Sequence, residues 1–156
     1  MPTTAGPAKV TTGTVIKTLQ QLGTAATGAL EVIEWGISFD GSAAATPGVC
    51  ELIDTTAIAA TVTAYVAADI TAVSGAANRL ATTIGLTTTT SGYTATIEGT
   101  TTTSRTGDFQ LLPPTAPYIK QFPLERGFEV FASELLRVRV TFGTAINAIS
   151  YIVWQE

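Results

Sequence analysis

The chain has 156 residues, enough to bury the core of one domain, and only 13% of them are charged, about half the usual fraction. The net charge of −4 and the scattered positions of three lysines and five arginines exclude the clustered basic surface that nucleic-acid binding requires. The lack of histidine and the single cysteine exclude imidazole catalysis and a thiolate zinc site, and no apolar window is long enough to cross a membrane.

Threonine is the commonest residue, and it suits a pleated surface because it is β-branched and its hydroxyl stays hydrated without charge. The composition therefore predicts a mostly β protein with a neutral polar surface. We expect no enzymatic activity, no cofactor, no metal and no small-molecule substrate.

Residues 1–12 contain Pro2, Gly6 and Pro7 without an apolar period, which predicts an extended N-terminal arm before a single domain at 13–156. An ordered arm of this kind is expected to be held by a neighbouring chain. There is no basic stretch followed by an apolar one, so we expect no secretory signal and synthesis in a reducing cytoplasm.

Strands are predicted at 14–22 and 29–39. In the second strand, alternation places Ile33, Trp35, Ile37 and Phe39 on one face and Glu34 on the other. If the strand is regular, Glu31 and Glu34 lie on opposite faces and make a poor acid–base pair.

A loop at 40–48 leads to a short strand at 49–54, in which Cys50 is expected to be a small buried apolar residue. The segment 55–66 is ambiguous, since its first part could form a helical turn and its second part alternates like a strand. Residues 67–92 predict an irregular excursion with one short strand at most.

The next segments predict a strand at 93–98, a polar turn at 99–108, an apolar strand from Phe109 and a proline-rich connector at 113–117. The stretch from Tyr118 to Phe122 predicts either an exposed adhesive segment or a strand at the edge of the sandwich. Glu125 and Glu129 flank Arg126, and a charged corner with a local ion pair is favoured over a catalytic pair of carboxylates.

Strands are then predicted at 128–133, 135–142 and 149–156. In "LLRVRVTF", alternation puts Arg137 and Arg139 on one face and the apolar residues on the other. Two readings remain open: the arginines bind acidic groups of a partner chain, or they form a solvated strand face that discourages edge pairing.

Eight or nine short strands with turn-rich links predict an all-β fold, an antiparallel two-sheet sandwich or a barrel. Trp35 and Trp154 lie in apolar strands, so core packing is expected for both.

The order of these segments, above all the blocks "EWGISFDG" and "LRVRV" and the terminal strand "ISYIVWQE", resembles small head-decoration or minor capsid proteins of tailed bacteriophages. The resemblance covers about residues 14–156 and involves no catalytic signature. It implies a jelly-roll-like β-sandwich of about eight strands on the outer surface of the virion.

This resemblance implies a cement role, in which homotrimers bind the major capsid protein and stabilise contacts between its subunits. The residues predicted to contact other chains are Arg137, Arg139, Arg126, Tyr118, Phe122, Lys9 and Val10. An alternative is a tail- or fibre-associated β-sandwich that recognises a host glycan through exposed aromatic residues.

Overall fold

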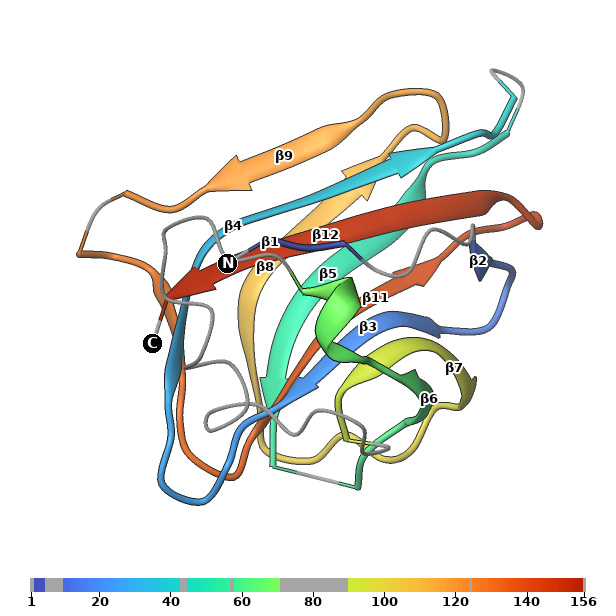
Figure 1. The fold of residues 1–156 in the computed structure, drawn as a ribbon. Helices are drawn as coiled ribbons and strands as arrows, with labels where there is room; N and C mark the ends of the chain where they lie inside the picture. Colours follow the sequence, from blue (N-terminus) through green and yellow to red (C-terminus); the bar gives the residue numbers. More distant parts are fainter. Residues whose placement is uncertain are drawn as a thin grey trace.

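The structure is a computed structural model that describes residues 2–4, 10–42, 45–56, 58–70, 90–123 and 125–155 (Figure 1). In these ranges the regular structure is all β apart from one 3-10 turn, η1 (Ala67–Asp69). The strands are β1 (Pro2–Thr4), β2 (Val10–Thr11), β3 (Lys17–Gly23), β4 (Leu30–Phe39), β5 (Gly48–Thr55), β6 (Thr61–Ala64), β7 (Gly92–Ile97), β8 (Ser104–Leu112), β9 (Tyr118–Gln121), β10 (Phe128–Val130), β11 (Leu135–Thr141) and β12 (Asn147–Gln155).

All strand pairs are antiparallel, and they form two sheets. Sheet A has the order β1–β12–β4–β10, with β2 also pairing with β12 and β9 also pairing with β4. Sheet B has the order β6–β7–β3–β11–β5–β8. The prediction of an all-β two-sheet sandwich is confirmed, with more strands than the eight expected because several are only two to four residues long.

The core lies between the two sheets and is formed by the apolar faces of the long strands. Trp35 of β4 and Trp154 of β12 are 0% and 1% exposed, and Leu52 of β5 and Val138 of β11 are fully buried with them. The predicted core packing of both tryptophans is confirmed. Cys50 is also fully buried, and burial raises the pKa of its thiol to about 12, so the thiol stays protonated and inert.

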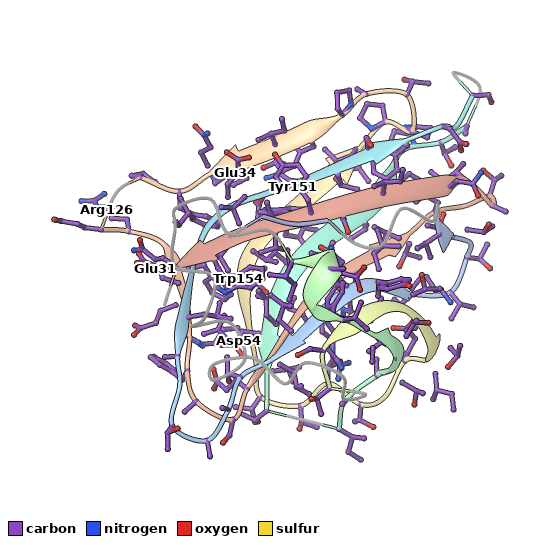
Figure 2. The ribbon with its side chains drawn as sticks, viewed as in Figure 1. Glu31, Glu34, Asp54, Arg126, Tyr151 and Trp154 are labelled. Carbon is purple, nitrogen blue, oxygen red and sulfur yellow. The ribbon has the colours of Figure 1, made fainter. Side chains whose placement is uncertain are left out.

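A bulge in β4 corrects the predicted faces of that strand. Trp154 pairs with Val32 and Val153 pairs with Glu34, which leaves Ile33 as an extra residue. The residues on either side of Ile33 therefore change parity, and Glu31 and Glu34 both lie on the outer face of sheet A (Figure 2). Two expectations are therefore wrong: Ile33 does not share a face with Trp35, and the two glutamates do not lie on opposite faces.

The outcome for three other segments varies. The strand β8 begins at Ser104, inside the predicted turn, because residues 104–106 pair with β5 although they are polar. In 55–66 only the strand prediction is confirmed, as β6. Most of the predicted excursion, at 71–89, lies outside the described residues.

The N-terminal arm pairs with its own chain. Both β1 and β2 lie antiparallel to β12, with Thr4 opposite Tyr151 and Val10 opposite Ala148. The arm thus extends sheet A at the edge of β12, whereas the sequence suggested that a neighbouring chain holds it. This pairing covers an edge of β12 that would otherwise be free to pair with another strand.

Candidate interaction surfaces

The arginine-bearing strand β11 lies in the middle of sheet B, between β3 and β5. Its apolar residues Leu136, Val138 and Val140 are buried in the core, so Arg137 and Arg139 share the outer face, as predicted. Because β11 is a central strand, these arginines cannot serve to protect a sheet edge.

Arg137 is buried beneath a layer that we call the β6–β7 cover, residues 58–64 and 92–100. Its Nη1 donates to the carbonyl of Glu98 at 3.0 Å and its Nη2 to the carbonyl of Ile58 at 2.5 Å. The guanidinium has no exposed surface, and burial together with the neighbouring Arg139 lowers its pKa. Arg137 therefore holds part of the chain to its own sheet, and the structure does not support it as a contact residue.

The cover is fixed by polar contacts to β3 as well. The side chain of Gln21 accepts from the amide of Ala60 at 2.9 Å and donates to its carbonyl at 3.2 Å. The carboxylate of Glu98 accepts from the amide and the hydroxyl of Thr18. The cover also contains a second small apolar cluster, formed by Ala60, Val62 and Ala95.

Arg139 forms an ion pair with its cross-strand neighbour Glu51 at 2.5 Å. The side chains of Arg139 and Glu51 are 14% and 15% exposed, so the pair is mostly covered and electrically neutral. Val10, also predicted as a contact residue, is 4% exposed and belongs to the core, and Lys9 lies outside the described residues.

Tyr118 and Phe122 lie at an edge of the sandwich, on and just after β9. Among the described residues β9 pairs with β4 alone, as the edge-strand reading expected. The Tyr118 hydroxyl donates to Asp108 Oδ2 at 2.8 Å, and Trp35 Nε1 donates to the same atom at 3.1 Å. Burial and Asp108 raise the pKa of Tyr118 to about 12. Tyr118 thus joins the two sheets, and Phe122 is half-buried against the core.

Arg126 is exposed at a corner that projects from the body of the molecule (Figure 2). Among the described residues, Arg126 forms no salt bridge with Glu125 or Glu129, so the predicted ion pair is not seen. A hollow of about 560 Å³ at this corner is lined by three glutamates and four other residues: Glu31, Glu125, Glu129, Ala29, Leu30, Gly127 and Gln155.

The outer face of sheet A carries a hydrogen-bonded network that the sequence did not reveal, because its members come from three strands, β4, β9 and β12, that are distant in sequence. The carboxylate of Glu34 accepts from the Tyr151 hydroxyl and from Gln121 Nε2, each at 2.5 Å. The Tyr151 ring lies so close to Gly36 that a Cβ there would be 2.3 Å from Cε1. Burial and Glu34 raise the pKa of Tyr151 to about 12, so its hydroxyl remains a donor.

A charged cluster at one end of the sandwich was also missed, since its members are far apart in the sequence. The Arg105 guanidinium pairs with Asp54 and, at 3.3 Å, with Glu134. Arg105 also lies over the ring of Phe131, 4.4 Å from the centroid. Arg105 comes from β8 and Asp54 from β5, while Glu134 lies in the link from sheet A to sheet B, so the cluster ties the layers together.

Large apolar side chains are exposed on β8, at the edge of sheet B. Phe109 is 57% exposed and Leu111 is 65% exposed, and both point to the outer face opposite Glu51 and Val49. The alternation in "FQLL" contained this signal, but the sequence could not show which face of the strand is covered.

Within the ranges given above, no three His, Cys, Asp or Glu side chains are grouped so as to hold a metal ion. No helix in the described parts of the chain has the length and hydropathy that a transmembrane segment requires.

The fold and its surfaces define this protein as a two-sheet antiparallel β-sandwich whose polar side chains mainly bond within the chain. No protein-family model matches the sequence, and no curated protein or solved structure matches it.

Proposed function

We propose that this chain is a virion structural protein that decorates the outer surface of a bacteriophage head and stabilises contacts between major capsid subunits. The observation that carries the proposal is the amount of exposed apolar surface. Ten large apolar side chains in the described residues are at least 39% exposed, among them Val15 at 74%, Ile58 at 72% and Leu111 at 65%. Surface of this kind is suited to burial against other chains.

The low charge of the chain supports the same role. Burying neutral threonine- and alanine-rich surface avoids the desolvation of unpaired ions, which costs several kcal/mol per ion. The partners proposed are the major capsid protein and, on the assembled head, further copies of this chain arranged as a homotrimer, which the resemblance to phage decoration proteins implies.

The test is to add the purified chain to assembled phage heads that lack it. We expect the chain to sediment with intact heads and to raise the temperature at which the heads release DNA. A chain that does not sediment with heads at micromolar concentration, or that leaves DNA release unchanged, contradicts the proposal.

A second candidate is recognition of a host glycan, and the network on the outer face of sheet A favours it. The two tryptophans cannot take part because they are buried. Tyr151 on Gly36, with Glu34 and Gln121 beside it, instead combines an aromatic ring with fixed hydrogen-bonding groups, which suits one face of a sugar.

Screening against neutral glycans tests this candidate. We expect Tyr151→Ala to abolish any binding found, and Ile58→Ala, on the β6–β7 cover, to leave it unchanged. Binding that survives Tyr151→Ala, or no binding to any glycan, contradicts this second candidate.

A further inference from the structure

The edge of sheet B at β8 has three features that suit it to pairing with a strand of another chain. β8 is nine residues long, it pairs with β5 on one side only among the described residues, and its outer face exposes Phe109 and Leu111. A long edge strand with exposed apolar side chains is a template for pairing with another strand.

The backbone at this edge is oriented for such pairing. The Phe109 amide donates to Asp108 Oδ1 at 3.0 Å and therefore not to β5. In an antiparallel strand the N–H and C=O of one residue point to the same side, and every second residue points to that side. Phe109 and Leu111 therefore both present their backbone groups to the free edge. Gln110 between them presents its backbone groups to Cys50 of β5.

We propose that β8 pairs antiparallel with β8 of a second copy of this chain, around a two-fold axis at Gln110. In this register Phe109 lies opposite Leu111 of the second copy, and the reverse pair follows from the symmetry. The four exposed apolar side chains then form one cross-strand cluster on the outer face.

The charges of β8 are compatible with this register. Asp108 lies opposite Leu112 of the second copy, and Arg105 lies outside the paired residues 108–112, so no two like charges face each other. The nearest charged pair on the outer face, Arg139 with Glu51, is already neutralised within each copy. The edge at residues 109–112 is self-complementary and carries no charged side chain, which favours a second copy over a charged partner.

The backbone bonds expected are from the Leu111 amide of each copy to the Phe109 carbonyl of the other. The Phe109 amide keeps its bond to Asp108. Sheet B then continues through two copies of the chain. This contact has two-fold symmetry. It is independent of the proposed function, because self-association can be measured on the purified chain without phage heads.

Sedimentation of the full chain over a range of concentrations tests the proposal. We expect a monomer–dimer equilibrium and an increase of at least about tenfold in its dissociation constant for Phe109→Ser with Leu111→Ser. The matched control is Ile119→Ser with Ile149→Ser, which removes exposed apolar side chains from sheet A and should leave the dimer unchanged. A monomeric chain, or an oligomer that the β8 substitutions do not weaken, overturns the proposal.

Cross-linking provides a second measurement that does not depend on how the serine variant folds. In the proposed register Gln110 lies opposite Gln110 of the second copy, in a non-hydrogen-bonded pair. The Cα atoms of such a pair are about 4.5 Å apart, within the range that a disulfide spans. Gln110→Cys should therefore form an intermolecular disulfide on mild oxidation. The background is Cys50→Ala, because Cys50 is the cross-strand neighbour of Gln110.

The control for cross-linking is Gln121→Cys in the same background, on β9 at an edge of sheet A, and we expect it to remain monomeric on oxidation. Equal cross-linking of the two variants, or none at Gln110→Cys, overturns the two-fold register.

Discussion

At the scale of single residues, Asp54 is the clearest case of a side chain whose chemistry is set by its surroundings. It is 1% exposed, and burial, followed by its hydrogen bond with Glu134, raises its pKa from 3.8 to about 7, although Arg105 acts in the opposite direction. Burial alone would raise the pKa of Glu134 as well, but bonds from Asp54 and the Phe131 amide lower it. The pKa values of the two carboxyl groups are thus shifted in opposite directions beside one arginine.

We predict that Asp54→Asn removes a pH dependence of stability. A raised pKa means that the folded protein binds the Asp54 proton more tightly than the unfolded chain does. The resulting contribution to the free energy of unfolding is fully present below pH 3.8 and is lost as the pH rises through about 7. The free energy of unfolding of the wild type should fall over this range by an amount on the order of 1 kcal/mol or more. Asn cannot ionise, so this fall should be absent in the variant.

Urea denaturation at several pH values measures this effect. Glu129→Gln is the matched control, because Glu129 is exposed at the neighbouring strand β10. If the wild type and Asp54→Asn show parallel pH profiles, Asp54 is not the titrating group.

At the scale of elements, the β6–β7 cover shows how a sheet face can be closed without a helix. The cover contributes few apolar side chains, and its main attachments are polar: Arg137 to two carbonyls, Gln21 to Ala60 and Thr18 to Glu98. Removing such a donor leaves buried acceptors unpaired, which is costly. The stability of the cover therefore depends on a few side chains of β3 and β11.

Arg137→Thr is predicted to lower the free energy of unfolding by about 2–4 kcal/mol, because two backbone carbonyls lose their donor and a buried volume is left unfilled. Arg139→Thr should cost less, about 1 kcal/mol, since its ion pair is partly accessible to water. Chemical denaturation gives both values, and hydrogen exchange should show faster exchange in residues 92–97 for Arg137→Thr.

Arg126→Thr is the control for this series because Arg126 is exposed at the corner, and we expect a change below about 0.5 kcal/mol. Equal stability of Arg137→Thr and Arg126→Thr would show that the guanidinium does not anchor the cover. This expectation replaces the two readings drawn from the sequence, in which both arginines face either a partner chain or solvent.

At the scale of the whole molecule, the two sheets are closed differently at their edges. In sheet A the short strands β1 and β2 cover β12, whereas in sheet B the long strand β8 ends the sheet with exposed apolar side chains. The chain thus protects one edge with its own N-terminal arm and leaves another available for contact with a second chain.

Deleting residues 1–9 is predicted to destabilise the sandwich modestly and to increase self-association. The deletion retains Val10 in the core but leaves the edge of β12 at Tyr151–Val153 unpaired, which favours edge-to-edge contacts. Calorimetry should show a melting temperature lower by about 2–4 °C, and sedimentation should show larger species. An unchanged melting temperature and association state would mean that β1 contributes nothing to the closure of sheet A.

The sequence by itself determined the fold class and the burial of particular residues. The alternation in 29–39 and 135–142 indicated strands, and the apolar context of Trp35, Trp154 and Cys50 indicated a core, because alternation and hydrophobicity are local properties of the chain. The edge position of β9 was among the readings that the sequence left open.

Only the tertiary structure decided which surfaces are free. The bulge at Ile33 depends on the register with β12, the burial of Arg137 depends on residues 58 and 98, and the cluster of Asp54 with Arg105 and Glu134 depends on three separate segments. Each is set by pairing between residues distant in sequence, and a local pattern cannot specify which distant segment lies over a given strand face. The surfaces open to other chains are what remains after that pairing.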